Sequence, residues 1–482
     1  MTTEIILFLL ILAAPLAWLT LTRRWQLALF SVMILMIFEG AIRKWLLPEY
    51  QAQVYLLKDV LVLMAFYGFL RSPTPYGAHE PLIKGLRTAL VITAIYCFFE
   101  IANPYSPSPV VGLVGFKNYI LYCLIMFMVP YAFTSPQDVE RKIKIYMALM
   151  IPVALLGLFQ FFSPPDSWVN TYVNRGEEVQ SVARMGQSGS FARTSGTFSY
   201  IGGFATFVFA VFFLSLSTVI ANYRSMKSNY IGLALLISST LAMFTTGSRT
   251  VVFGILGFLP IVLFLCMRAR LITPRILVQL LFVTALAAGL ASLSASDAVN
   301  AFTYRANNSD SSIMRALTPF TEAIHAFGSS PPFGLGIGVT HGSAASLTGD
   351  PNYTWLHGNM HEMETARVLQ EVGLIGFVLV YAVRIYLFFL AVSMTRRLQT
   401  PLFKALSAAI AAYFLMHIFM FVINNPTAAL FYWFSAGLLF AMYRLEREPK
   451  RGAILTHPNV APNSSRRHPG WQVQHGAAGR RN

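Results

Sequence analysis

Apolar segments of similar length follow one another through most of this chain. There are thirteen of them, at about 5–22, 25–42, 54–70, 88–103, 111–133, 145–163, 198–221, 229–246, 250–267, 274–294, 370–394, 403–424 and 427–443. Each is close to the roughly 20 residues that an α-helix needs to cross a bilayer. Only 12% of the 482 residues are charged and 56% are hydrophobic, whereas a soluble domain has about 25% charged residues. The sequence therefore predicts an all-α, polytopic membrane protein with about 12 or 13 transmembrane helices.

The membrane domain is predicted to cover residues 1–445, followed by a polar, basic tail at 446–482. The tail is rich in Pro, Gly, Arg and His and is predicted to be disordered. No positive side chain precedes the apolar segment 5–22, so this segment is predicted to be a retained span and not a cleaved signal peptide. All three cysteines lie in apolar segments without paired spacing, which argues against a disulfide framework or a cysteine-based metal site.

The positive charges orient the predicted helices. Placing the first loop in the cytoplasm puts a series of short, basic loops on that side, as the positive-inside rule expects. The amino terminus is then outside, and the carboxyl-terminal tail is inside, where it can meet anionic lipid. Two long loops, 164–197 and 295–369, face the outside. Because the net charge of +16 resides mainly in short loops and the tail, it indicates membrane orientation and not nucleic-acid binding.

The longer outer loop ends in a group of ionisable side chains directly before an apolar segment. The sequence there is His357-Gly-Asn-Met-His361-Glu362-Met-Glu364-Thr-Ala-Arg367. Imidazoles, carboxylates and a guanidinium are costly to keep at the mouth of a membrane helix unless they have a function. This segment therefore predicts chemistry or ligand binding at the membrane surface.

The spacing within this segment predicts a helix that begins near Asn359. Asn359 followed by Glu362 resembles a capping box, which places His361 in the first turn. A helix amino terminus disfavours imidazolium, so His361 is predicted to be neutral and able to accept a proton. Glu364 and Arg367 follow at intervals of one turn on the same face. The alternative is an interfacial helix on which Glu364 and Arg367 form a solvated pair.

A zinc site is a second alternative for the same segment. His357 and His361 have the i, i+4 spacing that suits zinc on one helical face. Against this, the sequence is not H-E-x-x-H, no cysteine is nearby, and Gly358 and Asn359 disfavour a helix through His357. We therefore expect no metal and no other cofactor.

Arginines on the less basic side form a second group of candidates. Arg193 precedes Thr194-Ser-Gly-Thr-Phe198, Arg249 follows Thr245-Thr-Gly-Ser248, and Arg315 lies upstream of Pro332-Phe-Gly334-Leu-Gly336-Ile-Gly338. A single interfacial arginine usually only snorkels. Guanidinium groups bind phosphate oxygens bidentately, however, and turn amides add further donors. The group therefore predicts a phosphate-type anion site, and the glycines of residues 334–338 predict a tight turn, since no strand–helix context makes them a dinucleotide fingerprint.

Charged residues also lie inside two early apolar segments. Glu39 has Arg43 one turn further on, and Lys58 is followed by Asp59. These are predicted to be paired charges that fix helices near the outer surface. A proton or ion relay is the alternative, but the charges cluster near one face and do not cross the bilayer.

Together these motifs resemble the O-antigen ligase and polysaccharide polymerase superfamily, over roughly residues 110–440. The resemblance rests on the many spans, on the motifs at Arg193 and Arg249, on the glycine-rich loop, and on the stretch Leu369-Gln-Glu371-Val-Gly373-Leu-Ile-Gly376. The family segment usually pairs a His with a following Asn. Here Glu362 follows His361 and His357 precedes it, so either histidine can take the family role. The opening Arg43-Lys-Trp and Tyr55-Leu-Leu-Lys-Asp59 resemble exopolysaccharide polymerases more than ligases.

The resemblance implies a metal-independent, inverting glycosyltransferase at the outer, periplasmic face of a bacterial inner membrane. The donor would be a glycan on undecaprenyl pyrophosphate. Arg193, Arg249 and Arg315, together with Arg367, would hold the pyrophosphate. Either His361 or a carboxylate such as Glu364 would activate the acceptor hydroxyl as general base.

The expected product is a secreted polysaccharide built from lipid-linked repeat units. One alternative is ligation of a lipid-linked glycan to lipid A-core, because residue types do not separate the two acceptors. A further alternative is a polysaccharide or lipid transporter, although the sequence has no convincing duplicated pattern of the kind transporters show. Expected partners are the lipid-linked glycan, membrane lipid, a flippase and chain-length or export proteins, with no nucleic acid.

Overall fold

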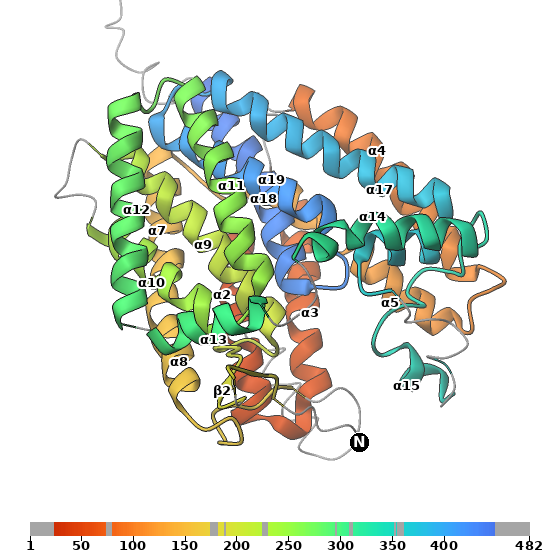
Figure 1. Ribbon diagram of the computed structural model, residues 1–482. Coiled ribbons are helices and arrows are strands. Elements are labelled where there is room, and N and C mark those ends of the chain that lie inside the picture. Colours follow the sequence, from red (N-terminus) through yellow and green to blue (C-terminus); the bar gives the residue numbers. More distant parts are fainter. Residues whose placement is uncertain are drawn as a thin grey trace, which may run out of the picture. The chain divides into compact units, whose positions relative to one another are not determined.

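The structure, a computed structural model, describes residues 24–448 apart from eight short gaps (Figure 1). The gaps are residues 74–79, 174–181, 188, 224–229, 295, 308–311, 351–352 and 354–360. Contacts divide the chain into two units, residues 1–447 and 448–482. The predicted span 5–22 and nearly all of the predicted tail lie outside the described residues, so the account below concerns the first unit.

Helices make up most of the described part of this unit. They are α2 (Trp25–Ala41), α3 (Gln51–Leu70), α4 (Glu80–Phe99), α5 (Pro109–Ile120), α6 (Cys123–Met128), α7 (Pro136–Ala148), α8 (Met150–Phe162), α9 (Ile201–Ala221), α10 (Tyr230–Thr245), α11 (Arg249–Arg268), α12 (Pro274–Ser294), α13 (Ser296–Asn307), α14 (Ser312–Ser329), α15 (Ala344–Thr348), α17 (Glu364–Arg397), α18 (Pro401–Phe419) and α19 (Pro426–Arg447). A π-helical turn, η1 (Ile42–Leu46), and short 3₁₀ turns η2 (Pro48–Tyr50), η3 (Glu100–Ala102) and η4 (Val129–Tyr131) extend several of them. Strands β1 (Arg184–Met185) and β2 (Phe191–Ala192) form one short antiparallel ladder, with Arg184 opposite Ala192.

The predicted all-α membrane architecture is confirmed. Within the described residues, ten helical segments are long and apolar enough to cross a membrane, and they match ten of the thirteen predicted spans. The predicted segments 229–246 and 274–294 form α10 and α12, which are helices but do not belong to these ten. The protein is therefore a multi-pass membrane protein, because apolar runs of this length satisfy their backbone hydrogen bonds inside lipid only as helices.

The helices α9 and α18 occupy the interior of the bundle and pack against each other. Phenylalanines of α9 fill this interior, and Phe204, Phe207 and Phe209 are fully buried. Outer helices instead keep large apolar side chains exposed, as at Leu155 of α8 and Phe264 of α11. An apolar outer face is what a helix facing lipid requires, since lipid tails are as apolar as the protein interior.

Helix α17 is broken at Gly373, where the backbone has φ 61° and ψ −168°. The glycine segment, residues 332–338, lies along this break. The N–H of Leu335 donates to the Gln370 carbonyl at 2.8 Å, and the N–H of Leu374 donates to the Pro332 carbonyl at 3.1 Å. A side chain at Gly373 would collide with the Pro332 carbonyl oxygen. The predicted tight turn, residues 334–338, thus belongs to a segment that forms backbone hydrogen bonds to α17 on both sides of its break.

The buried charges form pairs that differ in part from those predicted. The Glu39–Arg43 pair is confirmed, at 3.1 Å. The predicted Lys58–Asp59 pair is wrong, because Lys58 binds Glu39 at 2.9 Å and Asp59 binds Lys117 at 2.9 Å. Neighbouring residues on a helix point about 100° apart, so Lys58 and Asp59 meet different helices. These pairs connect α2, α3 and α5.

The predicted outer loops contact one another. Residues 195–199 bind Arg43 and Lys44 at the end of α2, and Arg193 binds the turn between α10 and α11. The glycine segment contacts Asn103 before α5. These contacts agree with an arrangement in which alternate loops share one side of the membrane. The side that faces the outside stays a prediction.

Candidate active site

Arg193 directly follows the β1–β2 hairpin and is held by its backbone. Its N–H donates to the Ala183 carbonyl at 2.8 Å, and its carbonyl accepts from the Tyr172 hydroxyl at 2.6 Å. The Nε of Arg193 donates to the Thr246 carbonyl at 3.3 Å. The half-buried side chain therefore lies on the turn that joins α10 to α11.

Gly247 allows this approach, and Arg249 follows it in the same turn. Gly247 has φ +58°, and a Cβ there would lie 2.6 Å from Met185 Sδ and 3.0 Å from Arg193 Cγ. Arg249, also half-buried, is the first residue of α11, whose first turn contains no acidic side chain. The positive end of the helix dipole and the backbone N–H groups of this turn favour an anion at the same place. The structure thus brings Arg193 and Arg249 to one turn with the character of an anion site.

The position of His361 differs from the expected one. The prediction that His361 lies in the first turn of a helix is wrong. Helix α17 begins at Glu364, and His361 lies in non-helical backbone before it. Met363 is extended, with φ −89° and ψ 142°, and its N–H donates to Glu322 Oε2 at 2.7 Å. A carboxylate from α14 therefore binds the backbone at the entry to α17. Asn359, the predicted cap, lies outside the described residues.

His361 is surrounded by side chains of α14 and by Arg367. It is only 6% exposed, and its ring centre lies 5.6 Å from that of His325 in an edge-on arrangement. Burial is the main reason that the pKa of His361 falls below its usual value; His325 and Arg367 lower it further, while Glu322 opposes the shift. The imidazole is therefore neutral at neutral pH and can accept a proton. The sequence predicted this neutrality from the helix dipole, but burial is the larger cause.

Glu364 is completely buried and bound on both oxygens. It forms an ion pair with Arg384, one of the few charged groups deep in α17. The backbone N–H groups of Val422, Ile423 and Asn424 also donate to its carboxylate, at 2.8 to 3.2 Å. Three consecutive amides around an anion form a nest. This geometry favours an anchor between α17 and the α18–α19 turn over the general base expected from the sequence, because a base needs an accessible oxygen.

Arg367 is not the partner of Glu364. The alternative of a solvated Glu364–Arg367 pair is wrong, since Arg384 takes that place. The Nε of Arg367 donates to the His361 carbonyl at 2.9 Å, and its guanidinium lies 5.7 Å from the ring centre of Phe421. Arg367 therefore helps to fix the backbone of His361 and contacts the α18–α19 turn.

The α18–α19 turn, residues 420–425, lies between the two groups of candidates. Glu364 and Arg367 bind it from one side. On the other side, Asn425 Nδ2 donates to Thr206 Oγ1 at 3.3 Å. Thr206 belongs to α9, which follows the segment that bears Arg193. One short turn thus connects the histidine to the helix behind the arginine segment.

Of the predicted site residues, Arg315 is described without its side chain, and His357 is not described. Arg315 lies on α14, two turns before Glu322, but its side chain is not among those described. His357 lies outside the described residues, so the choice between the two histidines stays a prediction. Among the residues that the structure describes, no group of three or more His, Cys, Asp and Glu side chains is arranged to hold a metal ion.

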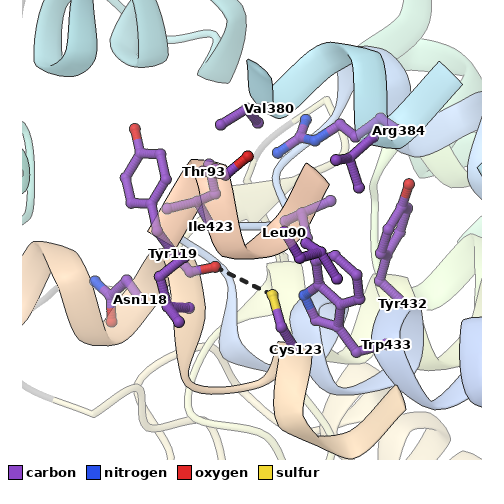
Figure 2. Close-up of a pocket in the computed structure, with 13 residues that line it drawn as sticks. Leu90, Thr93, Asn118, Tyr119, Cys123, Val380, Arg384, Ile423, Tyr432 and Trp433 are labelled. Carbon is purple, nitrogen blue, oxygen red and sulfur yellow. Dashed lines mark hydrogen bonds between the residues drawn. The ribbon is translucent and has the colours of Figure 1, made fainter. Parts of the chain in front are cut away.

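A pocket lies beside Arg384 (Figure 2). Most of its lining is apolar and comes from α4, α5, α17 and α19. The lining residues are Leu90, Thr93, Asn118, Tyr119, Ile120, Cys123, Val380, Val383, Arg384, Val422, Ile423, Tyr432 and Trp433. No predicted site residue belongs to this lining, so we do not assign the chemistry to this pocket.

Three residues near the site were not singled out in the sequence. Arg384 carried a signal, because a lone arginine inside the apolar segment 370–394 needs a partner. The sequence signal for Glu322 and His325 was weaker: they lie three residues apart on one strongly amphipathic helix. Their proximity to His361 depends on how α14 packs against α17 (Figure 1).

Comparison with protein families gives a match over part of this region. Residues 233–381 match the family described as O-antigen ligase. The match is narrower than the expected 110–440; it contains Arg249, His361 and Arg367 but not Arg193. Comparison with curated proteins and with solved structures gives no match. The chain thus carries a domain similar to the O-antigen ligase family within a multi-pass helical membrane protein.

Proposed function

We propose that this protein joins lipid-linked oligosaccharide repeat units into a polysaccharide at the outer face of a bacterial inner membrane. The donor is a glycan on a polyprenyl pyrophosphate, and the reaction inverts the sugar configuration without a metal. Two observations carry the proposal: half-buried Arg193 and Arg249 lie at the turn before α11, and a neutral, buried His361 lies just before α17. The match of residues 233–381 to the O-antigen ligase family supports it.

The reaction is a single displacement at the donor sugar. The acceptor hydroxyl oxygen forms a bond to the anomeric carbon while the bond from that carbon to the pyrophosphate oxygen breaks. The electron pair of the broken bond stays on the leaving pyrophosphate. His361 takes the proton of the acceptor hydroxyl as general base, for which a neutral imidazole is required.

The arginines act on the leaving group. Negative charge grows on the pyrophosphate as the glycosidic bond breaks, so cations aimed at it stabilise the transition state more than the ground state. Arg193 and Arg249 share one turn with the amino terminus of α11. Arg315 and Arg367, on α14 and α17, remain the second pair of proposed pyrophosphate ligands.

The outer face of α14 supports a donor anchored in the membrane. Large apolar side chains are exposed along this amphipathic helix, at Met314, Leu317, Phe320, Ile324 and Phe327. A helix of this kind lies in the membrane interface with its apolar face toward lipid. Its other residues, Glu322 and His325, contact the His361 segment. The proposed base would then lie at the level of the lipid headgroups, where a lipid pyrophosphate is found.

O-antigen ligation is the second candidate, because the matched family carries that description. The same arginines and histidine would serve it, since only the acceptor differs. In ligation the acceptor is a sugar of lipid A-core, and in polymerisation it is another lipid-linked repeat.

The test uses the purified full-length protein in proteoliposomes with a polyprenyl-pyrophosphate-linked repeat unit. A ladder of longer lipid-linked glycans that persists in a chelator supports the proposal. Transfer that requires added lipid A-core would assign the protein to ligation. The Arg184→Gln variant is a control for replacement of the site arginines and should keep the activity. Arg184 lies in the hairpin that precedes Arg193 but forms an exposed pair with Asp166. No transfer by correctly inserted protein with either acceptor would disprove the proposed reaction.

A further inference from the structure

Three cations surround one half-buried tyrosine near the end of α2 and the start of α3. Measured to the ring centre of Tyr55, the Arg43 guanidinium carbon lies at 5.2 Å, Lys58 Nζ at 3.5 Å and Lys117 Nζ at 4.7 Å. Two carboxylates, Glu39 and Asp59, pair with these cations. We call these six residues, Glu39, Arg43, Tyr55, Lys58, Asp59 and Lys117, the tyrosine cluster.

The positive charges of this region exceed the negative ones. Lys44 follows Arg43 and is only 7% exposed. Its ammonium donates to Ser195 Oγ at 3.0 Å and to the Gly196 carbonyl at 2.8 Å, and no carboxylate among the described residues pairs with it. With Lys44, four basic side chains face two carboxylates, so the region holds more basic than acidic groups. Buried charge of one sign is strongly unfavourable unless an opposite charge compensates it.

Two of the cations have donors without a partner in the described part of the chain. The Nε of Arg43 is buried and makes no hydrogen bond there. Lys117 has three N–H donors and makes one hydrogen bond, to Asp59, among the described residues, and its side chain is 21% exposed. Lys58, in contrast, binds both Glu39 and the Tyr55 carbonyl. The cluster is therefore paired internally but retains donors at Arg43 and Lys117.

The π-helical turn η1 connects this cluster to the arginine segment. Arg43 Nη1 donates to Ser199 Oγ at 3.2 Å, while Lys44 binds Ser195 and Gly196. Turns of this kind are frequent at functional sites, because the extra residue redirects side chains. Arg193 lies only two residues before Ser195 in the same segment. Residues 193–199 thus include Arg193 and also bind Arg43 and Lys44.

We propose that the tyrosine cluster, together with Lys44, is a second anion site that binds the phosphate of a second polyprenyl lipid. This inference rests on the proposed polymerase function, because polymerisation joins two glycans that are each carried on a lipid phosphate. The site at Arg193 and Arg249 holds the donor pyrophosphate. The cluster holds the phosphate of the acceptor lipid while its sugar reaches the base.

The test counts bound lipid. The full-length protein in phosphatidylcholine nanodiscs is titrated with undecaprenyl pyrophosphate, and native mass spectrometry gives the number of molecules bound. We expect two on the wild type, one on Lys117→Gln and one on Arg249→Ala. Lys117→Arg keeps the charge and should restore the second molecule, and the exposed control Arg184→Gln should keep both.

The outcomes separate this inference from the proposed function. A single bound lipid that is lost in Arg249→Ala but kept in Lys117→Gln would overturn the second site and leave the function intact. Binding unaffected by Arg249→Ala would instead count against the donor site. Nanodiscs that contain phosphatidylglycerol test the source of the phosphate. Two polyprenyl lipids should still bind there; a decrease to one means that ordinary anionic phospholipid fills the cluster, and the proposal fails.

Discussion

The arginine turn and the histidine region of the site are built in opposite ways. In the arginine turn, residues 193–199 and 245–249, backbone groups hold the loop, and the guanidinium of Arg193 lies on a glycine turn. In the histidine region, residues 361–367 and 420–425, a buried carboxylate binds a buried arginine and three backbone amides. The first region presents half-buried arginines beside the amino terminus of α11, whereas the second neutralises its charges inside the protein.

Because of this difference, we expect substitutions in the arginine turn to affect activity and substitutions in the histidine region to affect stability. We expect replacement of the half-buried arginines to have small effects on folding. A completely buried ion pair behaves differently, because removal of one partner leaves the other charge uncompensated. Variants in the two regions should therefore lose activity for different reasons.

The largest effect on activity is expected in the arginine turn. Arg249→Ala should abolish detectable polymer, with a loss of at least about 10³-fold, because it removes charge stabilisation of the leaving group. Arg249→Lys should also be poor, since a point charge lacks the bidentate geometry. Polymer length and thermal stability are measured together, and stability should be unchanged. Normal polymer from either variant would make Arg249 a membrane anchor.

His361→Ala should lower the rate of transfer by about 10²–10⁴-fold, the usual loss for a general base. Donor binding should remain nearly intact, which single-turnover assays and lipid binding can separate. His357→Ala is the matched comparison and should have a much smaller effect. A larger loss at His357 would move the base to that residue, and loss of activity in a chelator would favour the two-histidine zinc site.

Glu364→Gln should mainly destabilise the protein. The change leaves Arg384 buried without its counter-charge, which costs roughly 3–5 kcal/mol, and activity should fall in parallel with the folded fraction. Arg384→Met, away from the proposed chemistry, should have a similar effect on stability. If Glu364→Gln instead abolished transfer with an unchanged melting temperature, the carboxylate would be the base and the anchoring role would be wrong.

The pH dependence should show a smaller effect. The pKa of His361 is lowered, so the neutral form persists below the ordinary imidazole range near about 6.5. Activity should therefore be lost only as the pH falls through this lowered value. Glu322→Gln removes a charge that raises the pKa and should shift the acidic limb to lower pH, whereas His325→Asn should shift it upward. An acidic limb that neither variant moves would assign that titration to another group.

A cysteine label tests orientation with almost no effect on function. Ser346→Cys, on exposed α15, should react with an impermeant thiol reagent from outside, and Ser464→Cys should not. The native cysteines are all buried, so background labelling should be low. Labelling of the tail but not the loop would reverse the topology and remove the site from the outer face.

Much of the fold could be predicted from the sequence because a membrane imposes a length and a polarity on each helix. The same constraint made the arginines of the predicted outer loops conspicuous, and Arg193 and Arg249 do lie at one turn. The start of α17 was harder to predict. Its local capping pattern indicated Asn359, whereas Glu322 from a different helix binds the backbone where α17 begins at Glu364.

The sequence by itself determined the helical membrane class and the residue types from which an anion site and a base can be built. The tertiary structure decided which charges pair. Glu364 pairs with Arg384, twenty residues away, and Asp59 with Lys117 on another helix, instead of with the neighbours that sequence spacing favoured. The physical reason is that a buried charge is satisfied by whatever donors packing brings to it, and helix packing joins residues whose separation along the chain carries no signal.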